Sequence, residues 1–108
     1  DPKIGPVFDS VVEDWPEHLD KLTAFWSSVT LGSGRYKGNP MAAHRPHAPR
    51  ISAESFERWL ALWTEVTNDL LPAADASELQ MRATRMAINL QRGLAIDDTV
   101  TRARTVFR

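Results

Sequence analysis

Histidine is the residue type in this sequence with the clearest capacity for chemistry, and two of the three histidines lie close together. His44 and His47 stand three residues apart in the segment YKGNPMAAHRPHAPR, residues 36–50. A neutral imidazole is the most common metal-ligating side chain in proteins. The three prolines of this segment exclude a strand or a long helix, because each removes a backbone donor and restricts its predecessor. The segment therefore presents two potential metal ligands on a short irregular stretch.

His18 is the third histidine, and its position indicates that it points inward. It lies on the apolar face of an expected helix, four residues before Leu22 and seven before Phe25. A buried neutral imidazole needs partners for both ring nitrogens. One histidine facing a pocket from a helix, with another on a proline-flanked loop, would suit a flat iron-bearing ligand, with an axial ligand on one side and a polar group on the other. A zinc site is less well supported, because catalytic zinc usually has three protein ligands and no HExxH motif occurs.

Long helices are expected to position these side chains. Asp14 is a suitable N-cap for a helix over 15–31, and Gly32 supplies its end. Ser52 can cap a second helix over 53–71, whose apolar residues recur at helical spacing.

A third long helix is predicted to start at Asp75, with Glu78 as its capping-box partner, and to run over 76–94. The tail after it is weakly amphipathic and predicts at most a short terminal helix. No window shows sustained two-residue alternation, so the sequence predicts an all-α fold.

Composition limits the classes of function. The 108 residues are enough for one domain, 1–108, with a single core. A formal net charge of −1 gives no basic footprint for nucleic acid. The absence of cysteine excludes disulfides, thiolate metal sites and a thiol nucleophile, and it is compatible with a cytoplasmic setting. No apolar run is long enough to cross a membrane.

Two further patterns have simple structural explanations. The loop GSGRYKGNP lacks the preceding strand and the Lys-Ser/Thr pair of a phosphate-binding loop. Trp59 and Trp63 stand one helical turn apart, a spacing that is more often found in a core than in a cofactor wall. A haem-free, all-helical binding or oligomerisation module with a Trp-rich core is therefore an alternative to a cofactor protein.

Four segments resemble, in order and with similar gaps, the group III truncated haemoglobins: DPKIGPVF, DWPEHLDKLTAFW, GxGxYKGNPMAAH and FERWLALW. Together they cover residues 1 to about 94, which leaves 95–108 as a C-terminal extension. The resemblance implies the two-over-two helical sandwich of that family, which encloses one haem b. It also implies binding of oxygen or another diatomic ligand such as nitric oxide at a histidine-ligated iron, with redox or nitric oxide detoxification as the enzymatic rival.

The resemblance assigns roles to individual residues. His44 matches the proximal iron ligand, Phe8 the phenylalanine that packs on the porphyrin, and His18 the distal histidine. Trp59 matches the distal tryptophan that donates to bound ligand, whereas His47 has no counterpart and is expected at the surface. The resemblance implies further haem contacts of two kinds. The apolar walls of the pocket are expected to include Leu22, Phe25, Trp26, Met41, Ile51 and Phe56. The candidates for binding the haem propionates are Lys21, Arg35 and Tyr36.

One departure from the family concerns the start of the chain. The family carries roughly two helices before the GPVF segment, and the second supplies a distal tyrosine. This chain begins at Asp1, where those helices should end, and its single tyrosine, Tyr36, lies in another segment. The expectation is an N-terminally shortened sandwich that is either part of a longer polypeptide or able to self-associate, for example by domain swapping.

Overall fold

The computed structural model describes residues 1–96 and confirms the all-α prediction. Every regular element in that range is helical. In chain order the elements are α1 (Gly5–Val11), α2 (Trp15–Leu31), α3 (Pro40–His44), the 3₁₀ helix η1 (Arg45–Arg50), α4 (Ala53–Leu70) and α5 (Ala73–Gly93). The terminal helix considered after residue 96 lies outside the described residues.

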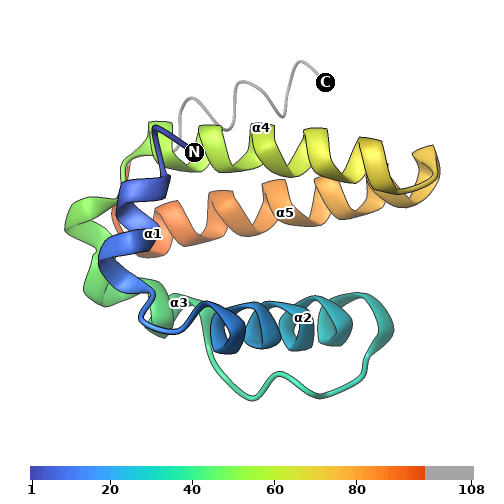
Figure 1. The fold of residues 1–108 in the computed structure, drawn as a ribbon, viewed down its shortest axis with the longest axis horizontal. Coiled ribbons are helices and arrows are strands. Elements are labelled where there is room, and N and C mark those ends of the chain that lie inside the picture. The colour runs from blue at the N-terminus through green and yellow to red at the C-terminus, as the bar shows by residue number, and fades with distance from the viewer. Residues whose placement is uncertain (97–108) are drawn as a thin grey trace.

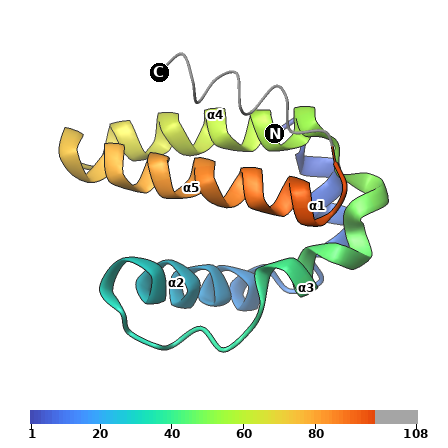
Figure 2. The same ribbon diagram turned by 180° about the vertical axis from the view of Figure 1, so that it is seen from behind.

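The helices form two layers that are joined at one end. Figures 1 and 2 show α4 and α5 side by side in one layer, with α2 lying opposite them in the other. α1 crosses between the layers at the end where α3 and η1 also connect them. This arrangement leaves α2 facing the α4–α5 pair across the interior of the molecule.

α2 begins and ends where the sequence predicts. The Asp14 side chain accepts a hydrogen bond from the Glu17 backbone N–H at 3.1 Å, which satisfies one of the free donors of the first turn. At the other end Gly32 adopts φ 66°, a left-handed conformation that glycine takes without steric cost. Its N–H donates to the Ser28 carbonyl at 3.1 Å.

α4 also starts as predicted, whereas the predicted start of α5 is wrong. Ser52 and Ser55 form a reciprocal capping box, each side chain accepting from the other's backbone N–H at 3.2 Å. α5 begins at Ala73 after Pro72, without a side-chain cap, so Asp75 lies inside the first turn. Glu78 is not a capping partner, because its carboxylate accepts from Arg82 Nε at 2.8 Å one turn further along the helix.

Residues 40–50 are more regular than the proline content predicts. Asn39 caps α3 by accepting from the backbone N–H groups of Met41 and Ala42 at 3.0 and 3.2 Å. Pro40 occupies the first turn, where its missing donor has no cost. The chain then tightens into η1. Because a 3₁₀ helix has three residues per turn, His44 and His47 lie near the same side of this connection.

The buried core lies between α4 and α5. It consists of Phe56 and Leu60 from α4 with Ala83 and Ala87 from α5. The two alanines are small enough to let the helix axes approach closely, so the α4 side chains fill the space between them. The half-buried residues that pack against this core are Trp26, Ile51, Trp59, Trp63, Leu90 and Ile96.

A candidate cofactor pocket between the two layers

A pocket of about 910 Å³ lies between the helical layers, and its walls are mainly apolar. The volume lies within the range of small-molecule and cofactor sites, roughly 300–1,000 Å³. α1, α2, α3, η1, α4 and α5 all contribute to the lining. Of the thirteen residues implied by the resemblance, the pocket brings together eleven: Phe8, His18, Lys21, Leu22, Phe25, Trp26, Tyr36, His44, Ile51, Phe56 and Trp59.

The other two implied residues, Arg35 and Met41, do not line this pocket. Arg35 is exposed in the loop between α2 and α3. The Met41 side chain lies against Gly93, so closely that a Cβ at that glycine would overlap its sulfur and methyl group. Because residues 40–44 form a helix that docks on α5, Met41 fills the contact between the two helices.

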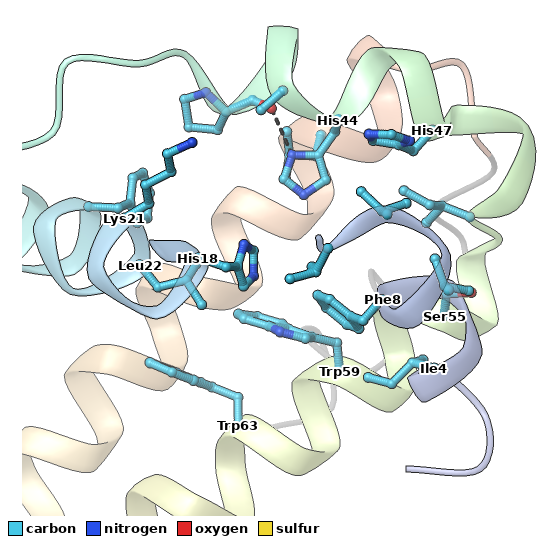
Figure 3. Close-up of a pocket in the computed structure, with 18 of the residues that line it drawn as sticks. Ile4, Phe8, His18, Lys21, Leu22, His44, His47, Ser55, Trp59 and Trp63 are labelled. Carbon is cyan, nitrogen blue, oxygen red and sulfur yellow. Dashed lines mark hydrogen bonds between the residues drawn. The ribbon is translucent and has the colours of Figure 1, made fainter. Parts of the chain in front are cut away.

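His44 is held in an orientation that leaves one ring nitrogen free for a ligand. Its Nδ1 lies 2.7 Å from the backbone carbonyl oxygen of Pro40. A carbonyl oxygen can only accept, so this bond places the imidazole proton on Nδ1 and the lone pair on Nε2. Figure 3 shows the half-buried ring projecting into the pocket. This is the arrangement by which proteins orient a metal-binding imidazole and raise its basicity.

His18 faces the same pocket from α2. Its ring makes edge contacts with the rings of Trp15 and Phe8, with centroid distances of 5.6 and 6.1 Å. The Nε2 atom is buried and has no hydrogen-bond partner among residues 1–96. Burial lowers the pKa of His18 below its ordinary value of 6.5, and the charge of Lys21 lowers the pKa further. The imidazole is therefore neutral at neutral pH.

Three tryptophans form a continuous stack along the pocket. The Trp26 and Trp63 rings lie 4.5 Å apart and the Trp59 and Trp63 rings 5.5 Å apart, with interplanar angles of 20° and 10°. Trp63 Nε1 donates to the Leu79 carbonyl at 3.2 Å, whereas Trp59 Nε1 has no such partner in residues 1–96. Both indoles pack on the core and both line the pocket, but Trp59 is the one with an N–H available to a ligand.

Comparison with known proteins identifies the family of this chain. The chain is 33% identical over 95 residues to the group 3 truncated haemoglobin ctb of Campylobacter jejuni, an alignment that spans 84% of this chain and 74% of that protein. This chain belongs to the group 3 truncated haemoglobins. No family model matches the sequence, and no solved structure matches it. As a member of that family the chain is a globin-type haem protein, and its all-α fold is the one that the family implies.

The residues of this truncated haemoglobin's pocket fit such a cofactor. An imidazole held by its Nδ1, as His44 is, and set among stacked aromatic rings matches the needs of a flat apolar ring with a metal at its centre. Within residues 1–96 no group of three or more His, Asp or Glu side chains could hold a metal ion.

Two charged or polar residues at the pocket edge are placed by local contacts. Lys21 Nζ lies 3.2 Å from the Glu17 carboxylate on the same exposed helix surface. The Tyr36 backbone N–H donates to Ser28 Oγ at 2.9 Å, and the Tyr36 ring meets the edge of Phe25 at a centroid distance of 5.1 Å. Both residues thus lie where the apolar pocket of this truncated haemoglobin meets solvent.

Several pocket residues were not anticipated from the sequence. His47 was expected at the surface, but it is half-buried and lines the pocket, because the 3₁₀ turn keeps it on the same side as His44. Trp63 could have been found from its position one helical turn after Trp59. The segment before α2 was not expected to contribute more than Phe8, and the structure adds Ile4, Val7, Val11 and Val12, together with Trp15 at the start of α2.

No helix in the described part of this truncated haemoglobin has the length and apolar character needed to span a membrane.

Proposed function

We propose that this truncated haemoglobin holds one haem b with His44 as the proximal ligand to the iron, and that it binds a diatomic gas, oxygen first, on the side of His18 and Trp59. The observation that carries the proposal is the bond between His44 Nδ1 and the Pro40 carbonyl, which commits one ring nitrogen and leaves Nε2 directed into the pocket. Haem supplies the gas-binding chemistry, and the chain controls orientation, polarity and access.

The chain's contribution on the distal side is an apolar wall with a donor at Trp59. The stacked indoles and the Phe8 ring give the pocket an apolar lining, and a polar contact made in such a low-dielectric environment is strengthened. Trp59 Nε1–H can donate to a bound diatomic molecule, because it has no partner in residues 1–96. The neighbouring Trp63 Nε1–H is already bound to the Leu79 carbonyl. The propionates of the cofactor would lie toward Lys21 and Tyr36 at the solvent edge.

Haem titration tests the proposal. Stoichiometric uptake with a Soret band is expected for the wild-type chain, and a strongly weakened or altered band for His44→Gly. Added imidazole should restore the band in that variant by occupying the space of the deleted ring. His47→Ala should keep the wild-type spectrum. A chain that takes up no haem would favour the haem-free helical module, whereas a defect in His47→Ala alone would move the ligand to His47.

Oxygen binding and transport is the function we propose, with redox or nitric oxide detoxification as the rival. The two functions share the pocket and differ in the fate of the bound gas. Slow oxygen dissociation with little nitric oxide turnover supports the first, and rapid turnover with a reductant supports the second. The setting we propose is the cytoplasm, because a chain without cysteine needs no oxidising compartment.

Self-association is proposed from the apolar surface that the chain exposes. On α2 and at the end of α4, the larger exposed side chains that do not line the pocket are Leu19, Leu31 and Leu70. A second copy that covered part of this surface would gain about 25 cal/mol for each Å² of apolar area buried. Sedimentation velocity should therefore show a mass above that of one chain, and a monomer at high concentration would contradict this expectation.

A further inference from the structure

α3 carries the proposed iron ligand, and two different contacts determine where its imidazole lies. The first is within the helix, where His44 Nδ1 lies 2.7 Å from the Pro40 carbonyl oxygen and the ring is oriented relative to α3. The second is between helices, because α3 packs mainly against η1, which directly follows it, and against α5. Since η1 only continues the chain, the contact with α5 is the one that fixes α3 against the helical layer opposite α2 (Figure 2).

Met41 and Gly93 meet at this contact, and they fit because Gly93 has no side chain. Gly93 is the last residue of α5, and Met41 is the second residue of the five-residue helix α3. A Cβ atom at Gly93 would lie 2.7 Å from Met41 Sδ and closer still to the Met41 methyl group. Ordinary contact between such atoms needs about 3.5–4.0 Å. The Met41 thioether therefore occupies the space that a side chain at position 93 would fill.

The contact between Met41 and Gly93 lies outside the pocket but is linked to it through His44. Neither Met41 nor Gly93 lines the pocket, whereas His44 does. Met41 precedes His44 by three residues in one continuous helical turn, and side chains at that spacing are neighbours on the helix surface. Because packed contacts transmit a displacement to their neighbours, moving Met41 away from α5 would shift or tilt the His44 ring.

We propose that Gly93 is a positioning residue for the iron ligand: by admitting Met41, it sets the height and tilt of His44 Nε2 relative to the haem. This inference rests on the proposed function, since it takes His44 as the ligand, and it goes beyond that function by assigning a role to a residue outside the pocket. Changing a residue that orients a metal ligand typically alters metal affinity by about 10–100-fold. The flexible thioether can turn partly aside, so the low end of this range, about tenfold, is expected here.

The test compares the haem-loaded wild type with Gly93→Ala. The iron–histidine stretching band in the resonance Raman spectrum, recorded directly after photolysis of the carbon monoxide complex, reports how His44 is held. Gly93→Ala should shift this band, and its haem should transfer to an excess of a scavenger protein about tenfold faster. Gly5→Ala is the matched control, because a Cβ at Gly5 would meet no atom within 4 Å. It should keep the wild-type band and the wild-type transfer rate.

Met41→Ala separates positioning of the ligand from a general loss of stability. Removing the thioether should itself shift the band, and adding Gly93→Ala to that variant should shift it no further, because the overlap is gone. An unchanged band in Gly93→Ala or in Met41→Ala would overturn the inference and leave the proposed function intact, and so would an equal shift from Gly93→Ala in both backgrounds. A wild type that takes up no haem, or a His44→Gly variant that keeps the wild-type band, would overturn both.

Discussion

α2 and α4 are helices of nearly equal length, 17 and 18 residues, but they use their apolar faces differently. α4 buries Phe56, Leu60 and Thr67 against α5. α2 has no buried residue, although it carries Phe25, Trp26 and several aliphatic side chains. Apart from Trp26, which packs against the core, the apolar face of α2 points into the pocket. The comparison indicates that the α4–α5 pair supplies most of the stability, and that α2 depends on what fills the pocket.

The largest expected effect on stability comes from a substitution in the core between α4 and α5. Leu60 is 8% exposed and does not line the pocket, so Leu60→Ala would leave a cavity in the core. Chemical denaturation should show a loss of about 2–5 kcal/mol in the free energy of unfolding. Leu31→Ala, at a residue of α2 that is 82% exposed, should change the free energy by no more than about 0.5 kcal/mol. Equal losses in the two variants would contradict the comparison.

Filling the pocket should stabilise the folded chain and reduce the difference in stability between α2 and the α4–α5 pair. Free haem at 100 times its dissociation constant is expected to raise the free energy of unfolding by about 2.7 kcal/mol. Hydrogen exchange monitored by mass spectrometry should show the greatest added protection in α2 and α1, which frame the pocket and lack a packed core of their own. Added protection confined to α4 and α5 would show that α2 does not depend on the pocket's occupant.

A smaller effect is expected at the contact that holds α1 on α4. Arg58 Nη2 lies 2.7 Å from Asp1 Oδ1, and Asp1 Oδ2 accepts the backbone N–H groups of Lys3 and Ile4. The Arg58 side chain is 37% exposed, so solvent screens the pair and Arg58→Ala should cost about 0.5–1 kcal/mol. Haem should also dissociate faster, because α1 carries Phe8. Lys3→Ala should leave the haem dissociation rate unchanged, which controls for the loss of a positive charge.

The smallest effect is a pH dependence that comes from His18. Its folded-state pKa lies below 6.5, so the unfolded chain takes up the proton first as the pH falls. The free energy of unfolding should therefore decline as the pH drops through 6.5 toward the folded-state pKa, and level off below it. His18→Leu should remove this decline, and Lys21→Gln should remove part of it. A decline of the same size in His18→Leu would assign the pH dependence to another group.

Local signals in the sequence were sufficient for the helices whose ends are capped by side chains or glycine. Asp14, Gly32 and Ser52 act on backbone groups within a few residues, so their effects can be predicted from spacing alone. The start of α5 was misjudged because Asp75 and Glu78 match a capping box in spacing. The helix instead begins directly after Pro72, and Glu78 pairs with Arg82.

The sequence by itself determined that the chain is helical and, through its resemblance to a family, which histidine is the expected iron ligand. Tertiary structure decided which side chains meet. It brought His18, His44 and His47 to one pocket and turned Met41 onto Gly93. It also committed the Trp63 N–H to Leu79, while the Trp59 N–H has no partner in residues 1–96. The reason is physical. Helix caps are set by contacts within one turn, whereas a pocket is set by how separate helices pack, and a one-residue shift in the chain before His44 turns the side chains that follow it to another side of their helix.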